Sequence, residues 1–276
     1  MHTERLSPAA QAFDDIALRF DERFGSWLSV AAQRRAVRRQ LLRAFEPRSR
    51  VLEIGGGTGE DAVWLQKQGR EVLLTDAAPS MVSVAKAKLG SRPEYAPIAI
   101  AAERLSDLAD ERARCGLAPF DGAFSNFAAL NCVSDLREVG QGIARLVRVG
   151  APLLIVAFGV MPIGEWVVQL ARGKPRAAFR RLSSGDVHAR LGSREFTVRY
   201  HRTRDIELAL RPFFRLLERR GIGVFVPPSA AEPWISTHPC LVAALEGLDR
   251  AFARPLALLG DHVLHRFIRT DMRSTE

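Results

Sequence analysis

The stretch from Val51 to Glu60 reads VLEIGGGTGE, a short apolar run that breaks into glycines. Glycines at this spacing let a turn of backbone approach a ligand closely, and the flanking residues decide which ligand. A P-loop has a lysine directly after its last glycine, and this run contains no lysine. The dinucleotide fingerprint G-x-G-x-x-G needs a glycine at position 60, which is Glu60. Both phosphate-binding loops are therefore excluded.

Acidic residues surround the glycine turn and indicate the charge of its ligand. Glu60 and Asp61 open the helix expected after the turn, and Glu53 stands just before it. A helix N-terminus binds phosphate through free N–H groups and a positive dipole end, and acids there would repel an anion. A ligand with an ammonium, a sulfonium and ribose hydroxyls would tolerate or prefer them. S-adenosylmethionine (SAM) is such a ligand.

The elements that position this turn follow from hydrophobic periodicity, which alternates between strand and helix and predicts an α/β, doubly wound, mostly parallel sheet. Strands are expected at 51–55, 71–76, 96–102, 120–127 and 151–159. Helices are expected between them at about 59–69, 79–90, 104–115 and 134–148, with glycines at or near their ends. The glycine turn therefore joins the first strand to the helix that follows it.

The flanking segments differ in character from this core. Residues 9–45 predict one or two helices with an apolar stripe, and 162–182 predicts a helix in two pieces broken by Gly173 and Pro175. Farther on, 193–200 predicts a strand with His188 in a loop before it, 203–213 a helix, and 213–226 a strand. Helical residues around 238–253 precede a closing strand at 262–270.

Composition bounds the class of protein. The 276 residues are 47% hydrophobic, enough for one large α/β core, so we expect a single domain. No apolar run approaches the roughly 20 residues that cross a bilayer, and the N-terminal segment has no signal-peptide core, which predicts a soluble, cytoplasmic protein. The three cysteines are scattered, which predicts neither a zinc site nor disulfides. Most of the net charge of +9 falls in residues 161–276.

Glu53, Gly55, Gly57 and Gly59 resemble the acid-x-Gly-x-Gly-x-Gly turn of the class I SAM-dependent methyltransferases, most closely the bacterial small-molecule branch that includes quinone-type enzymes. The resemblance covers residues 13–160 by motif and the rest by strand order. It implies a Rossmann-like, seven-stranded sheet whose antiparallel edge is 213–226 with 262–270. The organisation expected within the single domain 1–276 is an N-terminal helical cap (1–46), a SAM-binding core (47–160), an inserted substrate cap (161–202) and a C-terminal part of the sheet (203–276).

The resemblance also implies roles for residues. The glycines would admit the methionine part of SAM, and Glu53 would hold its ammonium. Asp76 stands 21 residues after Gly55 and would accept hydrogen bonds from both ribose hydroxyls at the carboxyl edge of the sheet. The usual Asp near adenine is absent from the stretch that ends in Ala102 and Glu103. The expected cofactor contacts are Glu53, Gly55, Gly56, Gly57, Gly59, Asp76, Ala77, Met81, Ala102, Glu103, Asn126 and Phe127.

Methyl transfer from SAM mainly requires alignment and exclusion of water, and it requires a general base only if the acceptor brings its proton. Ser125-Asn126-Phe127-Ala128 lacks the Asp/Asn-Pro-Pro-aromatic tetrad of amino-methylating DNA and protein enzymes. The fifth strand ends without the acid of metal-dependent catechol enzymes, so no metal is expected. The acceptor pocket is expected at Phe20, Asn131, Glu165 and Trp166, with Tyr200 and His201 as candidate acid/base residues.

The expected substrate cap carries a basic cluster with no acid inside it: Arg172, Lys174, Arg176, Arg180 and Arg181. Two interpretations stay open. The cluster is either a lid over 172–182 that contacts anionic lipid or admits an acidic or amphipathic substrate, or a solvated helix face.

The sequence thus predicts an enzyme that methylates an O, N or C atom of a small molecule, a secondary metabolite or a lipid- or quinone-like precursor, and releases S-adenosylhomocysteine (SAH). One alternative is an RNA methyltransferase, suggested by the basic half, although no appended RNA-binding module is recognisable. Another is a methyltransferase-like binding protein without turnover.

Overall fold

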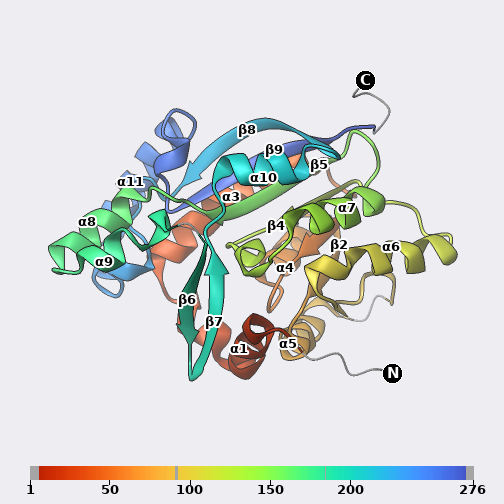
Figure 1. Ribbon diagram of the computed structural model, residues 1–276, viewed down its shortest axis with the longest axis horizontal. Helices are drawn as coiled ribbons and strands as arrows, with labels where there is room; N and C mark the ends of the chain where they lie inside the picture. Colours follow the sequence, from red (N-terminus) through yellow and green to blue (C-terminus); the bar gives the residue numbers. More distant parts are fainter. Residues whose placement is uncertain (1–5, 91–92, 184, 272–276) are drawn as a thin grey trace.

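A seven-stranded sheet forms the centre of the computed structural model, which describes residues 6–90, 93–183 and 185–271 (Figure 1). The strand order is β3-β2-β1-β4-β5-β9-β8. The parallel strands are β1 (Arg50–Ile54), β2 (Glu71–Asp76), β3 (Ile98–Ala99), β4 (Gly122–Ser125) and β5 (Pro152–Phe158). β9 (His262–Arg269) runs antiparallel to β5 and to β8 (Phe214–Ile222). The predicted seven-stranded, mostly parallel sheet is confirmed, whereas the ends of the expected range 1–276 lie outside the described residues.

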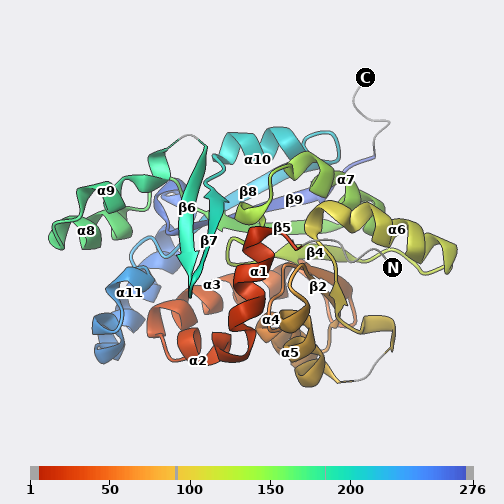
Figure 2. The same ribbon diagram turned by 60° about the horizontal axis from the view of Figure 1, so that its bottom comes forward.

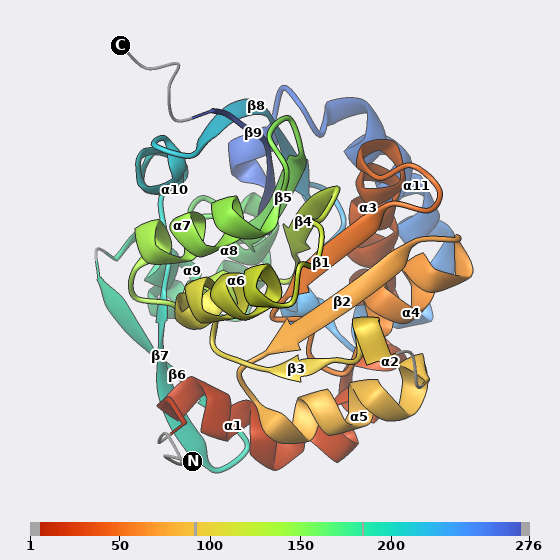
Figure 3. The ribbon, with the colours of Figure 1, turned by 90° about the vertical axis from the view of Figure 1, so that its right-hand side faces the viewer.

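Helices cover both faces of this sheet (Figure 3). Leu52 and Ile54 face the cluster formed with α6 (Leu105–Arg114), α7 (Leu136–Leu146) and α10 (Thr203–Leu210). Val51, directly before Leu52, faces the opposite cluster, formed with α3 (Leu28–Ala44), α4 (Glu60–Lys67) and α5 (Pro79–Leu89). Successive residues of a strand point to opposite faces, so a strand that is apolar throughout is buried on both sides.

The N-terminal segment forms α1 (Pro8–Ile16) and α2 (Phe20–Gly25) ahead of α3, in line with the helices expected over 9–45. Pro8 stands at the first helical position of α1, and the side chain of Ser7 accepts a hydrogen bond from the backbone N–H of Ala10, as helix starts favour. α11 (Pro239–Phe252) packs on α3 through Val242 and Ala32.

A two-stranded hairpin corrects the expected loop around His188. β6 (Asp186–Leu191) pairs with β7 (Arg194–Arg199), and His188 lies inside β6. The hairpin stands beside α1, where Phe196 and Val198 pack on Ala9 and Ala12 (Figure 2). The alternation of apolar Val187, Ala189 and Leu191 with polar residues is the period of a strand with one face covered.

Two further elements differ in length from expectation. β3 covers only Ile98–Ala99 of the expected 96–102, because Pro97 has no N–H to donate to a ladder. The insertion forms α8 (Ile163–Ala171) and a single turn, α9 (Pro175–Ala178), so the break at Gly173 and Pro175 is confirmed. Within the described chain, none of the helices has the length and apolar character needed to span a membrane.

Candidate functional site

The glycine turn between β1 and α4 requires glycine for steric and conformational reasons. Gly55 has φ of +65°, and a Cβ built on it would collide with the Cβ of Ala129. Gly57 has φ of +55°, but there a Cβ would meet nothing within 4 Å. Gly57 lines a large cavity, so its bare backbone leaves room for a ligand beside it. Gly59 does not line the cavity and instead stands, with φ of +82°, as the N-cap of α4.

Asp76 lies at the end of β2 and lines the same cavity. Its Oδ2 accepts a hydrogen bond of 2.8 Å from the backbone N–H of Gly57, and its Oδ1 accepts one of 2.9 Å from that of Ala78. Burial raises the pKa of Asp76, and these backbone N–H groups oppose the rise. Each carboxylate oxygen has a second lone pair, so Asp76 retains acceptor capacity for a pair of ribose hydroxyls.

Glu53 is buried just before the turn, with 2% of its surface exposed. Its Oε2 has no hydrogen-bond partner among the described residues. Burial raises the pKa of Glu53 well above its ordinary value, and the nearby Asp61 and Asp76 raise it further. A buried carboxyl without a partner is costly unless a donor or cation is supplied, and the ammonium of SAM is such a group.

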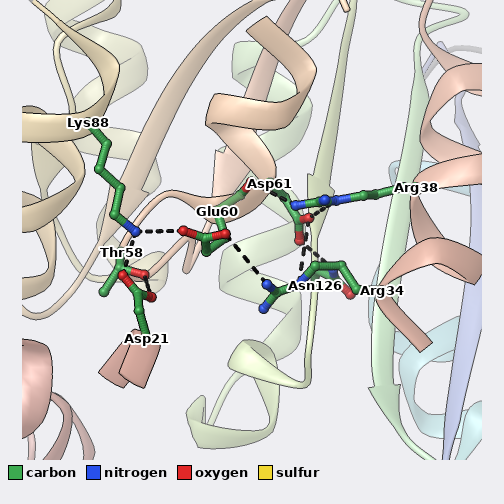
Figure 4. A network of polar contacts seen from close by, with 8 residues as sticks. All are labelled: Asp21, Arg34, Arg38, Thr58, Glu60, Asp61, Lys88 and Asn126. Carbon is green, nitrogen blue, oxygen red and sulfur yellow. Dashed lines mark hydrogen bonds and ion pairs between the residues drawn. The ribbon is translucent and has the colours of Figure 1, made fainter. Parts of the chain in front are cut away.

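The two acids that open α4 are engaged by basic side chains (Figure 4). Nζ of Lys88 lies 2.7 Å from Oε1 of Glu60, and Nε of Arg38 donates to Oδ1 of Asp61 at 2.7 Å. The expectation that Glu60 and Asp61 repel a phosphate at this helix start therefore needs correction, because basic side chains largely neutralise both acids. Among the three acids, it is Glu53 that leaves a carboxylate oxygen without a partner in the described structure.

The same network positions the loop after β4. Nδ2 of Asn126 donates to the free oxygen of Asp61, Oδ2, at 2.7 Å. Phe127 and Ala128 follow with φ of 46° and 61°, a left-handed conformation that residues with a side chain rarely adopt. Backbone strain of this kind collects at functional sites, and all three residues line the cavity.

The cavity has a volume of about 1250 Å³, above the roughly 300–1,000 Å³ typical of a pocket for one small ligand. One end holds the glycine turn and Asp76, with Met81 and Ala102 beside them. The other end is lined by the hairpin β6–β7, by α1 and by residues where β5 and β9 meet. Its size suits a cofactor together with a second molecule.

Most of the residues expected to bind SAM or the acceptor lie on this cavity. They are Phe20, Glu53, Gly55, Gly56, Gly57, Asp76, Ala77, Met81, Ala102, Glu103, Asn126, Phe127 and Tyr200. Their roles stay predictions, since the cavity shows where they lie and not what they bind.

Asn131 and His201 lie outside the residues that line the cavity. Nδ2 of Asn131 donates to the carbonyl of Arg199 at 2.6 Å, and its Oδ1 accepts from the backbone N–H of Phe158 at 3.1 Å. Asn131 therefore joins β7 to β5. Burial lowers the pKa of His201, and Arg199 lowers it further, which keeps its ring neutral away from the cavity.

Glu165 and Trp166 also lie off the cavity, for a different reason. Glu165 is buried and pairs with Arg180 at 2.8 Å and with Arg181 at 2.6 Å. Trp166 packs its ring on that of Phe179, 5.3 Å away between centroids. The basic cluster of the insertion is thus not free of acids, because Glu165 neutralises the two arginines at its end.

Sequence reasoning missed Phe158, Asp261 and His262 at the β5–β9 end, and it assigned Arg181, which lines the cavity beside them, to the basic cluster of the insertion. His262 opens β9 opposite Phe158, the last residue of β5. A strand that returns antiparallel to β5 begins at the carboxyl edge of the sheet, where ligands bind in doubly wound folds. The start of the final predicted strand was the signal that could have found His262.

Comparisons with known proteins agree with this geometry. Residues 52–153 match a family model described as a methyltransferase domain. No curated protein sequence is similar enough to the chain to count as a match.

Solved structures share the fold at low sequence identity. The CcbJ methyltransferase from Streptomyces caelestis has a TM-score of 0.59 at 15% identity, and the similarity covers 97% of this chain and 100% of that one. A putative SAM-dependent methyltransferase from Listeria monocytogenes has a TM-score of 0.58 at 14% identity, covering 87% and 98%. A SAM-dependent methyltransferase from Mesorhizobium loti has a TM-score of 0.53 at 17% identity, covering 88% and 100%.

These solved structures are similar to this chain in fold. They also confirm the resemblance seen in the sequence. Residues 52–153 match the model of a methyltransferase domain, and the chain has the fold of the class I SAM-dependent methyltransferases.

Proposed function

We propose that this protein transfers the methyl group of SAM to an O, N or C atom of a small molecule and releases SAH. The observation that carries the proposal is the unpartnered Oε2 of Glu53 beside a glycine turn and Asp76, in a cavity with room for a second molecule. The four segments expected within a single domain stay a prediction.

SAM supplies, when bound, a methyl carbon already activated by the sulfonium, so the chain has to bind, orient and exclude water. Glu53 would accept from the ammonium, and Asp76 from the ribose hydroxyls. Met81 is buried at 1% exposure and lines the cavity, which suits an apolar contact with adenine. These roles leave the β5–β9 end of the cavity for the acceptor.

The N-terminal cap is held over the cofactor end by polar contacts. Oγ1 of Thr58, in the glycine turn, donates to Oδ1 of Asp21 at 2.6 Å, and the backbone N–H of Ser80 donates to Asp14 at 2.6 Å. Phe20, next to Asp21, lines the cavity. This cap supports water exclusion, and its contact with the glycine turn is made by Asp21.

A small acceptor fits the opposite end better than a nucleic acid does. That end is covered by apolar side chains of the hairpin, Leu191 and Phe196, and Phe13 of α1 packs both beside them and on the cluster of Met81. RNA-binding sites are instead built on basic surfaces with exposed stacking rings. Strong salt-dependent affinity for RNA would favour the alternative function.

Calorimetric titration tests the cofactor assignment. SAH should bind the purified protein, and NAD should not, because the turn lacks the dinucleotide fingerprint. Glu53→Ala should weaken SAH binding, whereas Asp110→Asn, an exposed acid paired with Arg145 away from the cavity, should leave it unchanged. Binding of NAD in preference to SAH would contradict the proposal.

Membrane contact over 172–182 is retained as a narrower proposal. Arg180 and Arg181 pair with Glu165, which leaves Arg172, Lys174 and Arg176 beside exposed Leu170 and Phe179. Basic and apolar side chains together suit an anionic bilayer surface. Cosedimentation with anionic vesicles should fall when those three cations are replaced, and unchanged cosedimentation would remove this proposal.

A further inference from the structure

The acceptor end of the cavity has an aromatic wall. The rings of Phe158 and His262 are stacked, with centroids 5.0 Å apart and an angle of 26° between them. Phe127 meets His262 edge-on at 5.8 Å, and Tyr200 packs on Phe158 at 5.6 Å. All four residues line the cavity. Guanidinium groups lie over two of these rings, that of Arg181 over Phe158 at 4.8 Å and that of Arg34 over Phe127 at 5.2 Å, and a planar molecule would pack on the ring surface that they leave uncovered.

The carboxylate of Asp261 lies next to the ring of His262. Nδ1 of His262 is buried and lies 3.4 Å from Oδ2 of Asp261, an ion-pair contact in which Nδ1 makes no hydrogen bond within the described structure. Oδ1 of Asp261 accepts from Arg181 at 2.8 Å, and Oδ2 accepts from Nε2 of Gln33 at 3.1 Å. Burial alone would raise the pKa of Asp261, but Arg181 and His262 outweigh it and hold the pKa below its ordinary value.

The charge of an ionised Asp261 favours the tautomer of His262 that carries its proton on Nδ1. With the proton on Nδ1, facing the carboxylate, Nε2 on the other edge of the ring carries a lone pair. A carboxylate in this position also stabilises the imidazolium that forms if Nε2 takes up a proton. The arrangement is that of a general base rather than of a purely packed histidine.

Strand order places His262 on the acceptor side of the cofactor. The glycine turn, Asp76 and Ala102 follow β1, β2 and β3, whereas His262 opens β9, on the far side of β4 and β5. Neighbouring strands are about 4.8 Å apart, so β9 lies roughly 14 Å from β1. The strained loop at Phe127, after β4, lies between the two regions.

The buried charges at this end are compensated, whereas the exposed Arg190 of the hairpin lines the cavity with its Nε on the carbonyl of Gly192. Arg181, buried at 4% exposure, is flanked by Glu165 at 2.6 Å and by Asp261 at 2.8 Å. A cation held between two carboxylates has little attraction left for an anionic ligand. The end therefore favours an uncharged acceptor, in contrast to the acidic substrate that the basic cluster suggested.

We propose that His262 is the general base for an uncharged, planar acceptor that carries a hydroxyl or N–H group, an inference that rests on the proposed methyl transfer. The acceptor atom forms its bond to the methyl carbon as the carbon–sulfur bond breaks, and its proton passes to Nε2 of His262. The products are the methylated acceptor, SAH and a protonated His262, which returns the proton to water. Asp261 is a positioning residue in this step.

A binding experiment with naphthol and its methyl ether tests the proposal on SAH-saturated protein. Both probes are planar and uncharged, but only naphthol has a hydroxyl to donate to His262. The wild-type protein should prefer naphthol, and His262→Phe should remove that preference, a loss of about tenfold to a hundredfold for a hydrogen bond of this kind. His238→Phe is the matched control, because His238 is exposed at the start of α11 and lies away from the cavity.

Label transfer from SAM to naphthol gives the second readout. His262→Gln should slow transfer by between about a hundredfold and ten-thousandfold, and added imidazole should partly restore the rate. SAH affinity and thermal midpoint should stay close to wild type in both His262 variants. If either His262→Phe or His262→Gln fails to fold, the experiment with the other variant tests the proposal.

Three results would overturn the inference: no binding of naphthol to the SAH complex, equal preference in wild type and His262→Phe, or an unchanged rate in His262→Gln. Failure of the wild-type protein to bind SAH is a different outcome, because it would reject the proposed function itself.

Discussion

The backbone N–H of Gly57 donates a hydrogen bond of 2.8 Å to Oδ2 of Asp76, so the glycine turn after β1 is fastened to the end of β2. Gly57 lies in the turn that follows β1, Asp76 is the last residue of β2, and both residues line the cavity. Asp76 therefore does two things at once: it holds the shape of the turn and presents acceptor oxygens beside it. Binding and turn geometry should respond together when it is changed.

Replacing Asp76 by alanine should weaken SAH binding by on the order of a hundredfold or more. Hydrogen bonds to a charged group are worth about 1.5–3 kcal/mol each, and two ribose hydroxyls would lose their acceptor. The SAH affinity of Asp76→Asn should lie between those of wild type and Asp76→Ala. The amide keeps one acceptor oxygen, whereas two backbone N–H groups already donate to the carboxylate of Asp76. Calorimetry measures the affinities. Equal binding by wild type and Asp76→Ala would exclude this role.

Glu53→Gln should have opposite effects on stability and on binding. The raised pKa means that folded Glu53 holds its proton more tightly than the unfolded chain does, from an ordinary value of 4.5. Its contribution to stability is therefore present at acidic pH and is lost as pH rises through the folded-state pKa. At neutral pH without SAM the variant should unfold at higher urea concentration, and it should bind SAH more weakly. A variant that is less stable at neutral pH would contradict this prediction.

How far the sequence predicts the structure depends on how local the signal is. The glycine turn and Asp76 are read correctly in position, because each directly follows an apolar strand and parallel strands share an edge. Of the hairpin, the sequence predicts the strand at 193–200 but not β6, because the apolar residues Val187 and Leu191 give only a weak alternating pattern on an exposed ribbon. The pairing of β6 with β7 depends on the turn at Gly192, where φ is +61°.

The acceptor end depends on contacts that span long stretches of sequence. Arg181 meets Asp261 across 80 residues, and Asp261 meets Gln33 across 228. Neither pairing leaves a local pattern. Tyr200 and His201 illustrate the finer limit: neighbouring residues of extended chain point to opposite sides, and Tyr200 lines the cavity whereas His201 does not.

Arg181→Met should lower the free energy of unfolding by about 3–5 kcal/mol, because it leaves Glu165 and Asp261 buried without their shared cation. Arg176→Met is the matched control on the exposed part of the same insertion, and it should change stability by less than about 0.5 kcal/mol. Urea unfolding of both variants measures the difference. Equal stability of the two would show that Arg181 is dispensable for the fold.

His265→Leu should make the protein more resistant to acid. Burial, with help from Arg219, lowers the pKa of His265 from 6.5 to about 4, and neither ring nitrogen has a hydrogen-bond partner among the described residues. Its contribution to stability is present above pH 6.5 and is lost as pH falls toward 4, by up to about 3 kcal/mol. Thermal unfolding across this range should show a smaller decline in the variant. An identical decline in both proteins would assign the acid sensitivity to other groups.

The measurement that tests methyl transfer most directly incubates purified protein with methyl-labelled SAM and cell extract, and then counts label in organic, aqueous small-molecule, protein and nucleic-acid fractions. Asp76→Ala serves as the control, because it should lose the cofactor and the geometry of the glycine turn while keeping the β5–β9 end of the cavity. Label in an organic or aqueous small-molecule fraction, absent with Asp76→Ala, is the predicted result. Label confined to nucleic acid or protein, or equal labelling by both forms of the protein, would contradict it.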